Sequence, residues 1–267
     1  MKSYKDEIQL VRNARGVWCL DTIIGCKSGL SKDQRGCYGD CYAARSAVRR
    51  GFDFSQSVKR RFYNGPHRLE VFRKLERIDS DFVRIGCSGD PSEDWQHTID
   101  VLFEICETQK QIVIITRHWN LLTDADCEQI GKMGVCVNTS VSALDDSAQM
   151  ERSLQQYNRL KDYCDSVLRV VTCRFNTENE TGKHLYAIQQ KLLLNKNVID
   201  TAFRPSKTNP LVKDGVVIAT VEKFMRSRQL VSKNNPRVYM GKCSGCKEQC
   251  GVSFFGLKPR KQLAFSI

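Results

Sequence analysis

The thirteen cysteines are the residues of this 267-residue chain best suited to chemistry, and six of them fall into two closely spaced groups. Cys26, Cys37 and Cys41 form the first group, with the spacing C-x10-C-x3-C in a polar stretch that contains several glycines. Thiolates in such a loop can surround one metal centre, and they select zinc or an iron–sulfur cluster. Three ligands leave one metal position open, whereas a structural zinc site normally closes with four.

The second group lies near the C-terminus. Cys243, Cys246 and Cys250 have the spacing C-x2-C-x3-C with interleaved glycines, which is typical of a metal site. Three local ligands are again one short of a closed zinc site. Two interpretations stay open: a distant cysteine completes a zinc site, or the group binds an auxiliary iron–sulfur cluster.

The other seven cysteines fall mostly at apolar positions of predicted strands and helices, which is typical of packing. A high, odd cysteine count in a reducing compartment argues against a disulfide scaffold and for metal ligation. Cys19 could supply a fourth ligand to the first group, but its place inside a predicted strand favours a small buried side chain. The seven are Cys19, Cys87, Cys106, Cys127, Cys136, Cys164 and Cys173.

Six runs rich in valine and isoleucine predict strands, and amphipathic stretches between them predict helices. After the first, the runs recur at intervals of roughly 30 residues, which suits a strand, a loop and a crossover helix. Several runs are apolar at successive positions, which indicates parallel strands covered on both faces. The pattern predicts an α/β fold, either an open doubly wound sheet or an incomplete β/α barrel. The runs are Gly16–Thr22, Phe82–Cys87, Gln111–Thr116, Val135–Ser140, Ser166–Cys173 and Asn197–Phe203.

Polar residues follow several of these runs, at the strand ends where parallel α/β proteins bind ligands. They are Ser88-Gly89-Asp90, Arg117-His118, Ser140-Val141-Ser142 and Arg174-Phe175-Asn176. Each could equally be an ordinary cap or turn.

Positive charge is concentrated in two zones. The net charge is +12, and residues 203–267 carry thirteen Lys or Arg against three acids. Residues 42–77 carry ten Lys or Arg against three acids. Both zones interleave aromatic residues, as nucleic-acid-binding surfaces do, and a solvated basic face is the alternative. We expect residues 1–205 to form the α/β domain and residues 206–267 a basic, cysteine-containing extension.

The composition, 41% hydrophobic and 27% charged, indicates a soluble globular protein. The apolar runs are too short to span a membrane, and the first residues lack the apolar stretch of a signal peptide. A cytoplasmic location without membrane contact is therefore expected.

The three-cysteine loop after the first strand of a six-fold β/α unit resembles the radical S-adenosylmethionine superfamily. Gly25-Cys26, Gly36-Cys37 and Cys41-Tyr42-Ala43 are similar to the GC…GC…CYA loop of a phage and bacterial branch related to spore photoproduct lyase. Thr116-Arg117-His118 is similar to the strand end that follows in that branch. The spacing departs from the C-x3-C-x2-C that is commonest in the superfamily. The resemblance spans roughly residues 15–205 and implies a partial (β/α)6 TIM-like barrel of parallel strands.

The resemblance implies that Cys26, Cys37 and Cys41 hold a 4Fe–4S cluster whose fourth iron chelates S-adenosylmethionine. An electron donor such as flavodoxin or ferredoxin would drive cleavage to methionine and a 5′-deoxyadenosyl radical, which abstracts a substrate hydrogen. Strand-end residues would contact S-adenosylmethionine: Ser88, Gly89 and Asp90 at the ammonium, Arg117 or Arg169 at the carboxylate, and Asn138 and Ser140 at the ribose. Turns, helix caps and surface arginines are the alternatives for these residues.

Relatives of the lyase use a thiol as a hydrogen donor. Cys87, at the end of the second predicted strand, would face the radical and is a candidate for that role. One of the three C-terminal thiols is the alternative. His118, beside Arg117 at a strand end, is a further candidate for substrate or cofactor contact.

The expected function is hydrogen abstraction from a nucleic-acid base, such as a modified thymine in DNA during hypermodification, rearrangement or repair. The base would have to be flipped out or single-stranded to reach a radical deep in the barrel. One alternative is a radical enzyme that acts on a peptide or small molecule. Another is a non-enzymatic zinc protein that binds nucleic acid. A phage-encoded enzyme would work in the host cytoplasm.

Overall fold

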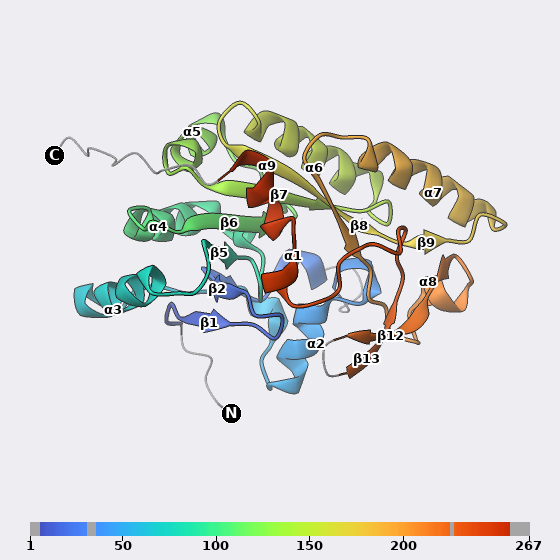
Figure 1. The fold of residues 1–267 in the computed structure, drawn as a ribbon, viewed down its shortest axis with the longest axis horizontal. Coiled ribbons are helices and arrows are strands. Elements are labelled where there is room, and N and C mark those ends of the chain that lie inside the picture. The colour runs from blue at the N-terminus through green and yellow to red at the C-terminus, as the bar shows by residue number, and fades with distance from the viewer. Residues whose placement is uncertain (1–5, 31–35, 225–226, 257–267) are drawn as a thin grey trace.

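A seven-stranded sheet forms the centre of the computed structural model, which describes residues 6–30, 36–224 and 227–256 (Figure 1). The strand order is β1-β2-β5-β6-β7-β8-β10, with β1 antiparallel to β2 and every other neighbouring pair parallel. Its strands are β1 (Leu10–Arg12), β2 (Trp18–Leu20), β5 (Phe82–Ile85), β6 (Gln111–Thr116), β7 (Cys136–Val141), β8 (Asp165–Thr172) and β10 (Val198–Ala202).

The six predicted strands are the six parallel strands of this sheet. Sequence patterning did not indicate β1, because three residues at a sheet edge carry too little periodicity. The parallel strands follow one another in chain order, without the reversal that defines a doubly wound sheet. The α/β class and the mostly parallel sheet are confirmed. The sheet is open, with β1 and β10 at its two edges, so a barrel is not established.

The helices between these strands cover one face of the sheet (Figure 1), as right-handed crossovers between strands in chain order require. Buried side chains such as Leu75, Leu102 and Ile130 pack from the helices onto Ile85 and Ile114 of the strands. Every one of these helices begins at a side chain that accepts a backbone N–H, which stabilises its first turn. They are α3 (Gly65–Glu76), α4 (Trp95–Ile105), α5 (Asp124–Lys132), α6 (Ser147–Leu160) and α7 (Glu180–Leu193), capped by Asn64, Asp94, Thr123, Asp146 and Asn179.

The C-terminal segment, red in Figure 1, packs against the opposite face of the sheet. Cys250 and Val252 share a buried cluster with Val113 of β6, Cys136 of β7 and Val167 of β8. A β-carbon on Gly251 would lie 2.5 Å from Val167 Cγ2, so only glycine allows this close approach. The extension thus completes the core of the sheet. Its elements are α8 (Pro210–Lys213), β11 (Val217–Ile218), β12 (Thr220–Phe224), β13 (Ser227–Val231), the 3₁₀ helices η4 (Cys243–Gly245) and η5 (Gln249–Gly251), and α9 (Val252–Phe255).

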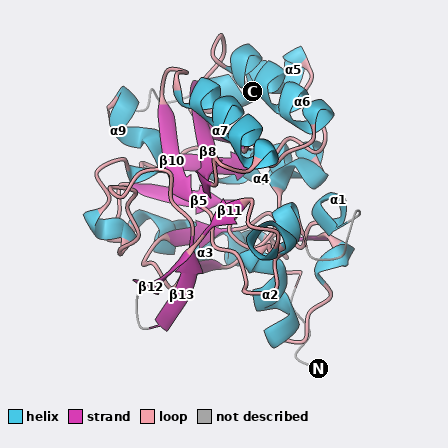
Figure 2. Ribbon diagram, turned by 90° about the vertical axis from the view of Figure 1, so that its right-hand side faces the viewer, coloured by secondary structure: helices cyan, strands magenta, loops and turns pink. Residues whose placement is uncertain are grey.

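Short elements surround the strand ends. The antiparallel β12–β13 hairpin lies apart from the main sheet (Figure 2), and β11 pairs with β9. Among the described residues, no helix is long and apolar enough to cross a membrane. Lys258, Arg260 and Lys261, which belong to the second basic zone, lie outside the described residues. The remaining elements are β3 (Ile23–Ile24), α1 (Lys27–Leu30), η1 (Cys37–Gly39), α2 (Tyr42–Arg49), η2 (Phe54–Gln56), β4 (Val58–Lys59), η3 (Pro91–Glu93) and β9 (Arg174–Phe175).

Candidate functional site

The first cysteine group lies at the carboxyl ends of the parallel strands. Gly25, just before Cys26, forms a parallel bridge with Gly89, which follows β5. Cys41 occupies the N-cap of α2, and this helix begins at Tyr42. The group is therefore placed beside the strand ends where its function was expected.

Two of the sulfurs in this group converge on Gly29. A β-carbon at Gly29 would lie 2.8 Å from Cys26 Sγ and 3.6 Å from Cys37 Sγ. A β-carbon at Gly36 would lie 2.3 Å from Cys41 Cβ. Glycine at both positions lets the cysteines approach one another, and the Gly29 amide donates to Cys26 Sγ at 3.3 Å.

Glu93 joins Cys26 to its surroundings. The Cys26 thiol donates to Glu93 Oε1 at 3.3 Å, and the same oxygen accepts the Ser28 amide at 2.8 Å. Burial raises the pKa of Cys26 far above its usual range, and the charges of Asp90, Cys37 and Glu93 add to this. Glu93 was not predicted from the sequence. It lies three residues after the Ser88-Gly89-Asp90 segment and belongs to no motif.

Cys37 and Cys41 are also protonated at neutral pH. Burial raises the pKa of Cys37 to about 12, although the Arg117 guanidinium opposes the shift. Burial likewise raises the pKa of Cys41, against the amides of Ala44 and Ala43. A metal that binds here must therefore displace protons from the thiols.

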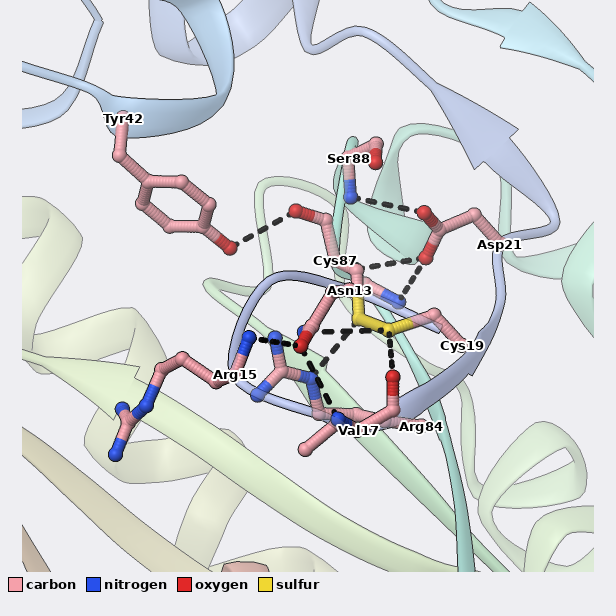
Figure 3. The surroundings of a disulfide bond; sticks show 10 residues. Asn13, Arg15, Val17, Cys19, Asp21, Tyr42, Arg84, Cys87 and Ser88 are labelled. Atoms are coloured by element: carbon pink, nitrogen blue, oxygen red, sulfur yellow. Dashed lines mark hydrogen bonds between the residues drawn. A yellow bond between two sulfur atoms is a disulfide. The ribbon is translucent and has the colours of Figure 1, made fainter. Parts of the chain in front are cut away.

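Asp21, directly after β2, ties together the ends of two strands. Its carboxylate accepts the amides of Gly86, Cys87 and Ser88 at 3.0, 2.7 and 2.9 Å (Figure 3). Burial raises the pKa of Asp21, and the Cys87 amide opposes that shift. Asp21 thus fixes the start of the Ser88-Gly89-Asp90 segment. The sequence gives one signal for it, an acid at the end of a predicted strand.

The Ser88-Gly89-Asp90 segment lies against the first cysteine. Ser88 O accepts the Gly25 amide at 3.0 Å, and a β-carbon at Gly89 would lie 2.5 Å from Ile23 O. Asp90 is buried, and its carboxylate accepts the Thr116 hydroxyl at 2.7 Å and the Arg117 amide at 2.9 Å. The Asp90 oxygens therefore hold neighbouring strand ends together.

Arg117 lies over the cysteine loop. Its guanidinium donates to the Tyr38 hydroxyl and pairs with buried Asp145. It also stacks on the rings of Tyr38 and Trp119, at 4.8 and 5.2 Å from their centroids. The guanidinium predicted to bind a carboxylate of S-adenosylmethionine is thus paired with a carboxylate of the chain itself.

Two buried donors beside the loop lack partners. Arg117 Nε and Trp119 Nε1 have no hydrogen-bond acceptor among the described residues. The Trp119 ring reaches within 3.5 Å of the β-carbon position of Gly29, where the Cys26 and Cys37 sulfurs converge. Thiols for ligands and unpaired N–H donors beside them fit an iron–sulfur cluster, whose sulfur atoms accept hydrogen bonds. Within the described ranges, however, no three Cys, His, Asp or Glu side chains form a ready-made metal cluster.

His118 points away from this site. It is fully buried, its Nε2 lies 2.9 Å from the Thr139 hydroxyl, and its ring packs on Trp95. Burial lowers the pKa of His118 to about 3, so the ring is neutral at physiological pH. Its surroundings are those of a core histidine.

The second cysteine group packs on the face of the sheet opposite to helices α3 to α7, rather than at the strand ends. Cys250 is 9% exposed, and Cys243 packs against the same buried cluster. Burial raises the pKa of Cys243, whereas the charges of Arg15 and Arg84 lower it. The Cys243 amide donates to Arg15 O at 2.8 Å. This group is therefore near arginines.

Asn138 and Arg169 lie beside the second cysteine group, not beside the first. Asn138 Nδ2 donates to Cys250 O at 3.0 Å, and Arg169 Nη2 donates to Asn138 Oδ1 at 3.0 Å. Arg169 Nη1 donates to the Thr201 hydroxyl at 3.1 Å. Ser140 lies opposite Arg169 in the β7–β8 ladder, so it shares this face. The predicted S-adenosylmethionine contacts are thus divided between two places.

Cys87 is paired with Cys19 in a disulfide, so Cys87 has no S–H to donate while the bond is present (Figure 3). Cys19 is buried, as expected, but it is bonded to Cys87 rather than only packed. The two meet because Cys19 lies opposite Arg84 in the β2–β5 ladder, three residues before Cys87. Strand register, which sequence patterning does not reveal, decides this pairing. Arg84 Nε donates to Cys87 Sγ at 3.0 Å.

Comparisons with known proteins identify no relative of this chain. No family model matches the chain, and no curated protein or solved structure matches it either.

Proposed function

We propose that this protein is a radical S-adenosylmethionine enzyme in which Cys26, Cys37 and Cys41 hold a 4Fe–4S cluster. One observation carries the proposal: the Cys26 and Cys37 sulfurs converge on Gly29 beside the carboxyl ends of six parallel strands in chain order. Parallel α/β proteins place their reactive groups at this edge. The partial β/α barrel of the superfamily would have the same strand order.

The residues around the loop have separate tasks in this proposal. When bound, the cluster supplies one electron to the sulfonium group of S-adenosylmethionine. Glu93 takes up the proton that Cys26 loses on ligation, since the thiol already donates to it. Arg117 Nε and Trp119 Nε1, which lack acceptors among the described residues, would donate to sulfur atoms of the cluster. Asp90 already accepts hydrogen bonds from Ser92, Thr116 and Arg117, so backbone carbonyls of the 88–90 segment would accept from the methionine ammonium.

The proposed substrate is a nucleic-acid base, such as a modified thymine in DNA. The last 65 positions hold thirteen basic residues against three acidic ones, which supports a polyanionic partner. Cys243, Cys246 and Cys250 are proposed to bind an auxiliary iron–sulfur cluster that holds a substituent of the base, with zinc as the alternative metal. A flavodoxin or ferredoxin would supply the electron.

Reductive cleavage of S-adenosylmethionine tests the proposal. Protein reconstituted with iron and sulfide without oxygen should release methionine and 5′-deoxyadenosine when dithionite is added. The Cys37→Ala variant should fall to the background rate, whereas Cys127→Ala, which removes a buried thiol from α5, should cleave at the wild-type rate. Equal cleavage by both variants would remove Cys37 from the site.

The same measurement separates the alternatives. Cleavage that is stimulated by a peptide but not by DNA would identify a radical enzyme with another substrate. Protein that binds zinc without iron, and never cleaves S-adenosylmethionine, would identify a zinc protein instead.

A further inference from the structure

An unpaired arginine lies between the two cysteine groups. Arg204 follows β10, and its guanidinium carbon lies 5.1 Å from the centroid of the Tyr42 ring and 5.2 Å from that of the Phe224 ring. Among the described residues, the Arg204 guanidinium has no carboxylate partner and no hydrogen-bond acceptor. Its charge is therefore uncompensated by the chain in this part of the molecule.

Other arginines gather around it. Arg45 Nη2 donates to Arg204 O at 3.2 Å, and the Arg15 guanidinium carbon lies 5.9 Å from the centroid of the same Phe224 ring. Burial lowers the pKa of Arg204, and repulsion from Arg15, Arg45 and Arg84 lowers it further. Asp40 offsets the charge of Arg45, since its Oδ1 lies 3.4 Å from Arg45 Nη1. Arg204 and Arg15 have no such carboxylate among the described residues, so an anion that joins them would be stabilising.

The group is connected directly to both cysteine sites. Tyr42, next to Cys41, donates its hydroxyl to Cys87 O at 2.8 Å, yet its side chain is 45% exposed. Arg15 donates to Gly241 O at 3.1 Å, in the segment that leads to Cys243 (Figure 3 shows Arg15, Arg84 and Tyr42 around the disulfide). An anion held here would lie between the two proposed metal centres.

We infer that Arg204, with Arg15, binds a phosphodiester group of a nucleic-acid strand and so positions the adjoining base at the first cysteine group. A guanidinium offers a planar pair of donors that matches two phosphate oxygens. The exposed Tyr42 ring beside it provides an aromatic surface for a neighbouring base. The inference rests on the proposed function for the identity of the substrate, but it requires only binding.

Affinity for a short single-stranded thymine oligonucleotide tests it, measured by fluorescence anisotropy at several salt concentrations without S-adenosylmethionine. Arg204→Gln should weaken binding about tenfold at low salt, because it removes a charge-assisted contact. The slope of log affinity against log salt should fall by about 0.7, which is one phosphate contact on a single strand. Arg204→Lys should keep the slope and recover part of the affinity.

The matched control is Lys183→Gln, which removes one positive charge from the exposed surface of α7, outside both basic zones. The control should keep the wild-type slope. Equal losses in Arg204→Gln and Lys183→Gln would overturn the inference, since only net charge would then matter. Displacement of the oligonucleotide by millimolar inorganic phosphate at constant ionic strength would also overturn it, because the site would then take free phosphate. Iron and S-adenosylmethionine cleavage, assayed on the same samples, show separately whether the proposed function holds.

Discussion

Cys26 of the first cysteine group and Cys243 of the second have opposite electrostatic surroundings. Cys26 lies among acids, because its thiol donates to Glu93 and the charge of Asp90 acts on it. Cys243 lies near Arg15 and Arg84. Burial raises the pKa of both thiols. The charges of Asp90 and Glu93 add to the shift at Cys26, whereas those of Arg15 and Arg84 oppose it at Cys243.

This difference separates two kinds of metal site. Burial, together with the acids beside Cys26, keeps the thiols of the first group protonated until a metal displaces the protons, so loading should depend strongly on pH. Arg15 and Arg84 oppose the effect of burial at Cys243 and favour the negative charge of a bound cluster. The first group is also at the open strand ends, whereas Cys250 of the second is built into the core. Exchange of ligands is therefore expected at the first group, and a structural or substrate-holding role at the second.

Removal of one cysteine from each group should have the largest and most unequal effects. Cys41→Ala should abolish cleavage of S-adenosylmethionine, since that group is proposed to bind the reactive cluster. Cys250→Ala should leave cleavage in the absence of substrate near the wild-type rate and lower the iron content. Quantification of 5′-deoxyadenosine and iron in both variants checks this. Loss of cleavage in both would mean that the groups act as one centre.

The Cys19–Cys87 disulfide should stabilise the protein by linking β2 to the residues that follow β5. It closes a loop with a sequence separation of 68 residues. Loss of such a crosslink costs about 4 kcal/mol in the chain-entropy model. Urea unfolding of the oxidised wild type and of Cys19→Ser should show this difference, and treatment with a reductant should remove it. Differential alkylation with mass spectrometry should find Cys19 and Cys87 protected together, and free thiols at both would contradict the pairing.

Arg84 should contribute to stability through its contacts under the disulfide. Arg84→Gln removes a charge-assisted hydrogen bond to Cys87 Sγ and a cation near Cys243, at a cost of about 2 kcal/mol. Arg12→Gln, which removes exposed contacts with Asp79, Gly16 O and the Trp18 ring, should cost less than about 1 kcal/mol. Urea midpoints measure both. Similar midpoints for the two variants would show that Arg84 is not a structural cation.

The smallest effect is a shift in the pH dependence of metal loading. The Glu93 carboxylate raises the pKa of Cys26, so Glu93→Gln should lower it and let the thiolate form at lower pH. The midpoint of cobalt binding, followed by the sulfur-to-cobalt absorption, should move to lower pH. Glu104→Gln, at an exposed glutamate of α4 paired with Arg68, should leave the midpoint unchanged. An unchanged midpoint in Glu93→Gln would place Cys26 outside the metal site.

The parallel strands were predictable from sequence, because runs such as Ile112–Ile115 are apolar at successive positions. Their order in the sheet was not, since a doubly wound sheet and an incomplete barrel fitted the pattern equally well. The loop before α2 was also predictable, since its cysteines and glycines are close in the chain. The partners of these residues were not. Glu93 reaches Cys26 across 67 positions, and Asn138 reaches Cys250 across 112.

Strand register explains most of what was missed. Asn138 and Arg169 were expected beside S-adenosylmethionine because both belong to strands that end at the functional edge. Whether a side chain faces the helices or the C-terminal segment depends on its place in the ladder. Strand register also decides that Cys19 and Cys87, which are 68 residues apart, lie close enough to bond, so their pairing could not be predicted from the sequence.

The iron and acid-labile sulfide content of protein prepared without oxygen tests the central claim most directly. The wild type should contain iron and sulfide in equal amounts, and the Cys26→Ala/Cys37→Ala/Cys41→Ala variant should contain about four fewer irons per chain. Zinc in place of iron, or an iron content that this triple variant does not change, would contradict the assignment of the first cysteine group.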